Sequence, residues 1–199
     1  MIDDDKLPEG ATPLDPDEAE GLIPGLTTRG ELNTFEQRNI ARAVEWSRSS
    51  KKLRSTLFEI ESLKLLHKRM FDETWKWAGK FRLTGKNIGV EPAQIQMQLH
   101  MLSADGNYWL DNQIFPIEEC AIRFHHRLVS IHPFPNGNGR HARLVADLLM
   151  YYSNRRIFSW GGESLDIEGK TRQRYIQALQ QADAGNYESL LNFAFGIPN

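Results

Sequence analysis

The chain has 199 residues, of which 40% are hydrophobic and 25% are charged, as is ordinary for a globular domain. Its 24 Lys and Arg against 26 Asp and Glu leave a net charge of −2, which excludes a strongly basic nucleic-acid coat and a polybasic membrane binder. The single cysteine, Cys120, favours a reducing compartment. Without a secretory signal or an apolar run of roughly 20 residues, we expect a cytoplasmic protein of one domain.

The first part of the chain predicts an arm followed by helices. Residues 1–26 are acidic and contain four prolines, so we expect an extended arm on the domain surface. A capping box at Thr34 and Gln37 predicts a helix that ends near Ser47, and apolar spacing predicts another over residues 55–73. Residues 80–91 are interrupted by glycine and asparagine, which favours a short β-hairpin.

The rest of the chain predicts further helices. They cover residues 93–112, with Gly106 as a weak point, then Pro116 to just before His132, residues 139–152, residues 171–183 and residues 187–195. Cys120, Phe124 and Leu128 should face the core. The fold class is therefore mostly α with one short hairpin, and a helical bundle is the expected architecture.

Residues 132–143 carry the chemistry, and they read His-Pro-Phe-Pro-Asn-Gly-Asn-Gly-Arg-His-Ala-Arg. Glycines entering a helix let backbone N–H groups converge on an anion, where the helix N-terminus adds partial positive charge. Arg140 and Arg143 project from the first turn and suit polyphosphate oxygens. His132 precedes the loop and can act as a general base. This combination indicates transfer of a nucleotide phosphoryl group.

The stretch resembles the Fic family signature, HxFx[D/E]GNGRxxR, at seven of its eight specified positions. The resemblance extends over residues 27–199, which we therefore expect to form a single Fic-type domain. Further similar segments are Leu66-His67, Trp77–Arg82 before the family's target-docking flap, Lys86–Gly89 in the flap itself, and Arg174–Leu179 in the closing helix. Gly10–Leu14 and Glu31–Asn33 also resemble the subfamily called mobile mystery protein B.

The resemblance implies a protein adenylyltransferase. In this family the motif histidine accepts the proton of a Tyr, Thr or Ser hydroxyl on a target protein. The hydroxyl attacks the α-phosphate of ATP, AMP is attached, and pyrophosphate leaves. His132 is then the general base, and a pKa near 6.5 would leave it a useful neutral fraction.

The resemblance also assigns the binding residues. Gly137, Asn138 and Gly139 hold the α- and β-phosphates, while Arg140 and Arg143 hold the distal ones. In the flap, it assigns target docking to Asn87, Ile88 and Gly89. Phe134 packs inward and fixes the loop.

Asn136 departs from the family pattern. The family has Asp or Glu there, which helps to hold Mg²⁺ on the phosphates. An amide carbonyl can bind Mg²⁺ without the negative charge, so binding through the protein should weaken. Two alternatives therefore stay open: a transferase of phosphate or another nucleotide moiety, and a nucleotide-binding interaction module without turnover. An intact His132 argues against the second.

Residues 27–50 contain a candidate inhibitory glutamate. Thr27 to Leu32 match the family's inhibitory pattern [S/T]xxxE[G/N] except at the last position, which implies that Glu31 pairs with Arg143 and blocks the γ-phosphate site. The alternative is a capping box of Thr28 with Glu31. Ser164 to Gly169 match the pattern literally, but the family keeps no inhibitor there.

Other features are interpreted structurally. His125 and His126 could suggest zinc, but neighbouring helical residues point about 100° apart and cannot easily converge on one ion. His67 and the tryptophans are expected to pack in the core, and the basic patch around Lys51 to be a solvated helix end. The partner is a protein substrate, and neither nucleic acid nor membrane is expected. The sequence leaves the oligomeric state open, a homodimer included.

Overall fold

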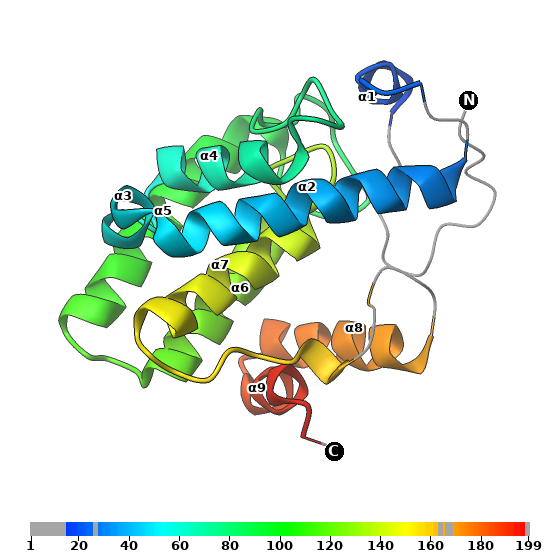
Figure 1. Ribbon diagram of the computed structural model, residues 1–199. Helices are drawn as coiled ribbons and strands as arrows, with labels where there is room; N and C mark the ends of the chain where they lie inside the picture. The colour runs from blue at the N-terminus through cyan, green and yellow to red at the C-terminus, as the bar shows by residue number, and fades with distance from the viewer. Residues whose placement is uncertain (1–14, 26–27, 163–164, 166–168, 198–199) are drawn as a thin grey trace.

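The computed structural model describes residues 15–25, 28–162, 165 and 169–197, which form a helical bundle (Figure 1). Its α-helices are α1 (Pro16–Ala19), α2 (Arg29–Ser49), α3 (Lys51–Ser55), α4 (Ile60–Phe71), α5 (Ile95–Asp111), α6 (Ile117–Ile131), α7 (Asn138–Tyr152), α8 (Lys170–Asp183) and α9 (Glu188–Phe195). Two 3-10 helices, η1 (Pro92–Gln94) and η2 (Trp160–Gly162), complete it. The mostly α fold predicted from the sequence is confirmed.

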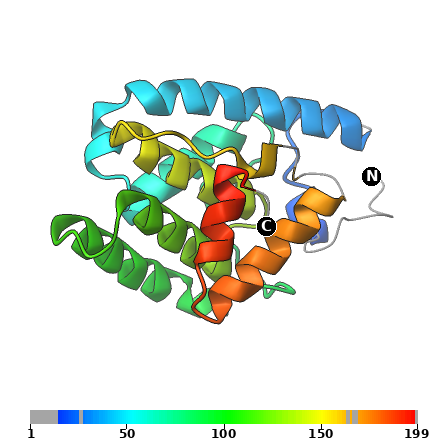
Figure 2. The same ribbon diagram turned by 90° about the horizontal axis from the view of Figure 1, so that it is seen from below.

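Helices α6 and α7 form the centre of the bundle. They are joined by the short loop 132–137 and pack closely against each other. Helix α2 packs on α4 and α7, while α5 lies against α6 and α4. Figures 1 and 2 show α2 along one side of this central pair and α8 with α9 on the other. The loop between the two central helices is thus surrounded by elements from distant parts of the chain.

The core explains the glycine within α5. As predicted, α6 buries Cys120, Phe124 and Leu128. A Cβ atom at Gly106 would lie 2.7 Å from the Phe58 ring and 2.8 Å from the Phe124 ring, and these two rings stack at 3.9 Å. Gly106 is therefore the residue that lets α5 approach the aromatic pair, because any larger side chain would push the helix away.

Helix α2 begins earlier than its predicted start at Thr34. The Thr28 hydroxyl accepts a hydrogen bond from Glu31 N at 3.2 Å, and the Glu31 carboxylate accepts one from Thr28 N at 3.1 Å. Thr34 lies inside the helix, where its hydroxyl donates to Gly30 O. The prediction at Thr34 was wrong because the sequence holds two capping-box patterns, and only the first one stands at the helix end.

Of the predicted helix over residues 55–73, only α4 (Ile60–Phe71) and the last residue of α3 are helical, because residues 56–59 form a turn; most of α3 lies before the predicted range. The Ser50 hydroxyl caps α3 by accepting from Leu53 N at 3.2 Å. The later helices begin and end within two residues of their predicted bounds. None of the described helices combines the length and the apolar character needed to cross a bilayer.

Residues 80–91, here called the flap, form a loop in which the structure shows no strand. Its two legs bond to the backbone around His132 instead of to each other: Arg82 N donates to Pro133 O at 3.0 Å, and Val90 N donates to Ile131 O at 3.3 Å. The predicted hairpin was wrong for this reason, since the donors of a ladder are used elsewhere.

The described part of the amino-terminal arm, residues 15–25, lies against residues 74–77, which precede the flap. Ile23 N donates to Thr74 O at 2.9 Å, and Lys76 N donates to Gly21 O at 2.8 Å. The Trp77 indole N–H donates to Glu18 O at 3.0 Å. Helix α1 interrupts the extended course that was predicted for the arm; residues 1–14 and 26 lie outside the described residues.

Candidate active site

His132 stands at the end of α6 and turns the chain into the loop. Its backbone has φ 54° and ψ 58°, the left-handed conformation that ends many helices. The side chain is 6% exposed. Burial, followed by the positive charges of Arg82 and Lys86, lowers the pKa of His132 to about 4. The imidazole is therefore almost wholly neutral at pH 7, which a general base requires.

His67 supports the loop through a hydrogen bond and a stacked ring. Its Nδ1 accepts a hydrogen bond from Gly79 N at 3.0 Å, so its Nε2 carries the proton and donates to Asn136 O at 3.0 Å. The ring stacks on Phe134 at 3.7 Å, and both side chains are fully buried. Burial holds the pKa of His67 well below its usual range, which keeps the ring neutral. The interpretation as a core residue is right, and the contacts add a role in fixing the loop.

Gly137 and Asn138 begin α7 and shape the anion-binding turn. Gly137 has φ 78°, and a Cβ atom there would lie 2.4 Å from the Phe71 ring. The Asn138 amide accepts from Phe134 N at 2.9 Å and donates to Phe134 O at 2.8 Å. Because this side chain braces the loop, the groups left to bind an anion are the backbone N–H groups at the helix N-terminus.

The two motif arginines have different neighbours. Arg140 forms an ion pair with Glu36 of α2 at 2.7 Å, and the other carboxylate oxygen of Glu36 accepts from the Trp75 indole N–H at 2.7 Å. Glu36 is 5% exposed, so this pair is shielded from water. Arg143 lies over the ring of Tyr175 in α8, with 5.8 Å between its guanidinium carbon and the ring centroid.

Behind Arg143 lies a buried polar group. The Tyr175 hydroxyl and His125 Nε2 are 3.0 Å apart, and burial with the Arg143 charge lowers the pKa of His125 to about 3. The Trp160 indole N–H donates to Asp147, and burial raises the pKa of that carboxyl to about 7. Tyr175 links Arg143 to this group, and the Arg143 charge acts on both His125 and Asp147.

Comparison with known proteins decides the family. Residues 57–150 match the family model described as Fic/DOC family. The chain carries a Fic/DOC family domain at these residues. It is 30% identical over 181 residues to protein adenylyltransferase fic-1 of Caenorhabditis briggsae, covering 86% of this chain and 33% of that protein. Protein adenylyltransferase Fic of Nematostella vectensis is 26% identical over 185 residues, covering 88% and 40%. The chain thus spans about a third of the length of the curated relatives it matches.

Solved structures agree with this Fic fold. The crystal structure of the BepC protein of Bartonella tribocorum with bound AMPPNP has a TM-score of 0.68 and 20% identity, covering 92% of this chain and 98% of that one. Fic-1 of Caenorhabditis elegans has a TM-score of 0.66 and 26% identity, covering 89% of this chain and 51% of that one. The similarity therefore extends well beyond the signature, to α2 and to the closing helices.

Arg82 connects the flap to the backbone of His132, and sequence reasoning missed this role. Its Nε donates to His132 O at 2.7 Å, one terminal nitrogen donates to Thr84 O at 2.8 Å, and the other donates to Val90 O. The side chain is 2% exposed. One guanidinium thus satisfies carbonyls from both legs of the flap and from His132 itself.

Glu36 was also missed, although α2 carries a signal for it. Leu32, Glu36 and Ala43 recur at helical spacing along the face that α2 turns toward the core, so an acidic residue on that stripe needed a partner. Glu31 is exposed and lies in the capping box with Thr28. Its pairing with Arg143 stays a prediction, because the ion pair that the structure describes for a signature arginine is Glu36–Arg140.

The histidines near the Fic signature lie in separate contacts. His125 meets Tyr175, whereas His126 Nε2 lies 2.8 Å from an Asp183 carboxylate oxygen and His141 Nε2 lies 3.0 Å from Leu63 O. The part of the chain that the structure describes contains no group of three or more His, Cys, Asp or Glu that could hold a metal ion. The Asn136 amide oxygen accepts from Gly137 N at 2.5 Å.

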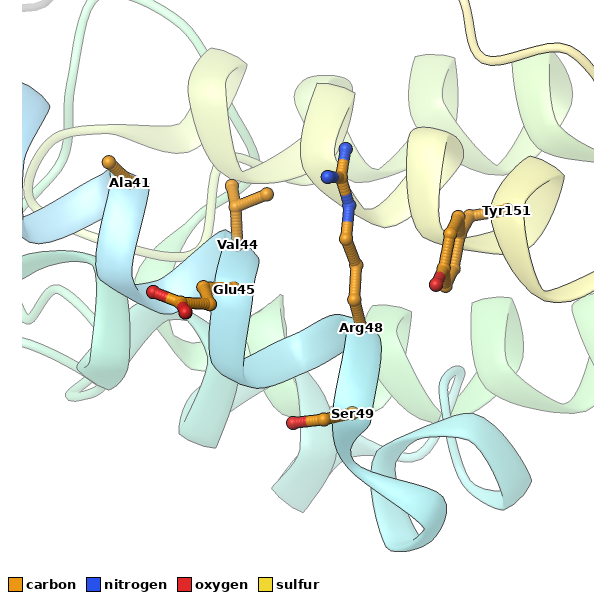
Figure 3. Close-up of a pocket in the computed structure, with 6 residues that line it drawn as sticks. All are labelled: Ala41, Val44, Glu45, Arg48, Ser49 and Tyr151. Carbon is orange, nitrogen blue, oxygen red and sulfur yellow. The ribbon is translucent and has the colours of Figure 1, made fainter.

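A hollow of about 480 Å³ lies between α2 and the far end of α7 (Figure 3). The Arg48 guanidinium lies over the Tyr151 ring there, 5.4 Å from its centroid. The hollow is lined by neither a histidine nor a helix N-terminus, the two features that the loop 132–137 brings together. Its lining residues are Ala41, Val44, Glu45, Arg48, Ser49 and Tyr151.

The predicted site residues fall into two groups. The loop brings His132, Asn136 and Gly137–Arg140 together at one end of the central helix pair, with Arg143 one turn further along α7. The flap residue Gly89 joins them: a Cβ atom there would lie 2.7 Å from His132 Cβ. Glu31 lies in the first turn of α2 and is separate from this group in its described contacts.

Proposed function

We propose that this Fic domain is a protein adenylyltransferase, which transfers AMP from ATP to a hydroxyl group of a target protein. The observation that carries the proposal is the buried, neutral His132 beside the amino-terminal end of α7. The names of the relatives support the same reaction. Because the chain spans only about a third of those relatives, the activity, substrate and partner are inferred for this chain.

The reaction follows from the positions of the groups. The target hydroxyl donates its proton to the His132 imidazole, and its oxygen forms a bond to the α-phosphorus of ATP. The bond from that phosphorus to the bridging oxygen breaks, and pyrophosphate leaves with the electron pair. The α7 N-terminus stabilises the developing negative charge, and Arg140 and Arg143 hold the distal phosphates.

Mg²⁺ enters in this proposal with the nucleotide, as MgATP. The protein offers the Asn136 amide oxygen, which already accepts a hydrogen bond from Gly137 N, and no carboxylate stands at that position. The residues present fit a metal carried mainly by phosphate oxygens better than one held by the protein. Asn136 therefore also favours the alternatives, which are transfer of phosphate or of another nucleotide moiety, and nucleotide binding without turnover.

We further infer that a glutamate of α2 restrains the enzyme by competing with the nucleotide for a signature arginine. Glu31 is the candidate from the inhibitory pattern, and Glu36 is the one in contact with Arg140. Since a carboxylate occupies the guanidinium that a phosphate needs, ATP must displace it.

The finer assignments are part of the same proposal. Residues 27–199 form the Fic domain and residues 1–26 the arm, within the mobile mystery protein B subfamily that Gly10–Leu14 and Glu31–Asn33 suggest. A reducing compartment such as the cytoplasm suits the single, buried Cys120.

The test uses ATP labelled at the α- or the γ-phosphate. Cell extract incubated with the protein should gain the α-label on protein and not the γ-label. His132→Ala should reduce this transfer by about 10²–10⁴-fold, whereas His100→Ala, at an exposed position, should leave it unchanged. Transfer of the γ-label would favour phosphate transfer. Nucleotide binding without either label would favour the binding module.

A further inference from the structure

Two acidic residues of the arm form ion pairs with Lys86 of the flap. Lys86 Nζ lies 2.9 Å from an Asp15 carboxylate oxygen and 2.6 Å from a Glu18 carboxylate oxygen. The Thr84 hydroxyl donates to Asp15 at 2.5 Å. The Lys86 side chain is only 2% exposed, so these contacts remove its ammonium group from water. The Lys86 ammonium group and the Thr84 hydroxyl thus form a small site on the flap that binds an anion, and the acidic side chains of the arm fill this site.

Carboxylates are suitable partners for the buried ammonium group of Lys86. An ammonium group that loses its hydration needs counter-charges within hydrogen-bond distance. The Thr84 hydrogen bond, and then Lys86, lower the pKa of Asp15, so this carboxylate stays charged. The pair of flap side chains therefore selects an anionic group over a neutral one.

The arm can release these contacts without leaving the domain. Its backbone is fixed further along, where Gly21 and Ile23 bond to the segment around Trp75. In contrast, α1 has only four residues. Its backbone is held by the Trp77 indole at Glu18 O, and its carboxylates reach the flap through side chains that can turn away while this bond remains. Withdrawal of Asp15 and Glu18 would expose Lys86 while the bridge at residues 21–23 remains.

The occupied place lies beside the proposed general base. Gly89 packs on His132 Cβ, and Arg82 ties both legs of the flap to the backbone there. Lys86 is close enough for its charge to act on His132. A target segment that brings a hydroxyl group to His132 along the flap must therefore pass Lys86 and Thr84.

We propose that Lys86 and Thr84 form a docking site for an acidic residue of the target protein, and that Asp15 and Glu18 fill this site as an internal substitute. The inference rests on the proposed function, because it names the class of segment that the transferase modifies. The substrate is then a hydroxyl-bearing segment with Asp or Glu close to the acceptor.

The binding test uses three fluorescein-labelled peptides of equal length. Each has one tyrosine, which is flanked by Asp, by Asn or by Lys. In fluorescence anisotropy, Asp15→Asn/Glu18→Gln should bind the Asp peptide about tenfold more tightly than the wild type does, since one charge-assisted contact is worth about that factor. It should also prefer the Asp peptide to the Asn peptide. Adding Lys86→Gln should abolish the preference, and Lys86→Arg should retain part of it.

The matched control is Asp17→Asn/Glu20→Gln, which makes the same change of charge at exposed residues of the same segment. It should behave like the wild type. The melting temperature of each variant shows whether it folds. Equal affinity for the Asp and Asn peptides in Asp15→Asn/Glu18→Gln, or a preference that survives Lys86→Gln, would overturn the proposal.

Transfer of the α-label to the same peptides separates this inference from the proposed function. Charge-selective binding without transfer would leave the docking site standing and contradict the adenylyltransferase. Transfer that is equal for the Asp and Asn peptides would do the opposite.

Discussion

The loop 132–139 and the flap 80–91 lie side by side and are held in opposite ways. In the loop, Asn138 braces Phe134, His67 holds Asn136, and Phe71 lies behind Gly137. In the flap, the side chain of Arg82 fixes the two legs, while Leu83 is 90% exposed. The proposed base and anion cradle are thus preorganised, whereas the surface proposed to meet the target is tethered mainly at its base.

Acid should loosen the loop before the flap. Burial lowers the pKa of His125 and His141 to about 3 and that of His132 to about 4, so the unfolded chain takes up more protons as the pH falls below 6.5. Asp147, with its pKa raised to about 7, acts in the opposite direction and offsets one histidine. His67, whose pKa is also held well below its usual range, adds to this loss, so the free energy of unfolding should fall by several kcal/mol between pH 7 and pH 5, as measured by urea denaturation.

Hydrogen exchange of the backbone amides shows which segments lose stability first as the pH falls. Protection should fall first around His132 and α7, because the flap contains no histidine. The variant His132→Asn should remove about 2 kcal/mol of the loss. A pH-independent stability would contradict the neutral, buried state of these residues.

Arg82→Met should detach the flap from the loop. Three carbonyls lose their donor, and a displacement of about 1 Å at the reacting groups can reduce the rate about 100-fold, so kcat should fall by that order. Loss of the positive charge should also raise the pKa of His132, which moves the acidic limb of the pH–rate profile to higher pH. Arg127→Met, at a residue paired with Asp105 on the surface, is the control. An unchanged limb would show that Arg82 has only a structural role.

Gly89→Ala and Gly85→Ala compare the base of the flap with its tip. Gly89 has φ 101°, and a Cβ atom there would lie 2.7 Å from both Arg82 and His132, so the substitution should cost about 1–3 kcal/mol and reduce transfer. No atom lies within 4 Å of a Cβ atom at Gly85, so Gly85→Ala should change little. Equal melting temperatures and rates would show that the flap is not packed on His132.

Glu36→Gln tests whether Glu36 restrains Arg140, the first arginine of α7. The amide can still accept from the Trp75 indole, but it loses the ion pair with Arg140, so we expect ATP to bind about fivefold more tightly by calorimetry. Weaker binding would mean that Glu36 positions Arg140 instead. Glu31→Gly separates the two interpretations of Glu31: loss of an inhibitory pair with Arg143 should raise ATP affinity and transfer rate together, whereas loss of a cap alone should lower stability by about 1 kcal/mol and leave ATP affinity unchanged.

The helices of the bundle could be predicted where one face is continuously apolar. Helix α6 is an example, because Cys120, Phe124 and Leu128 recur at helical spacing and Pro116 marks its start. Capping-box patterns are present at both Thr28 and Thr34, and the sequence alone does not indicate which of them begins the helix. Packing decided, since α2 extends to Thr28 and lies along α4.

By itself, the sequence determined the mostly α fold and the composition of the loop, because helical periodicity and a glycine-rich turn before two arginines are local properties. Only the tertiary structure decided which distant groups reach that loop. Arg82, Glu36 and Lys86 are ordinary charged residues in the sequence, and they acquire their roles from partners at least 50 residues away. The reason is physical: a buried charge is stabilised by its neighbours in space, and those are set by how the helices pack.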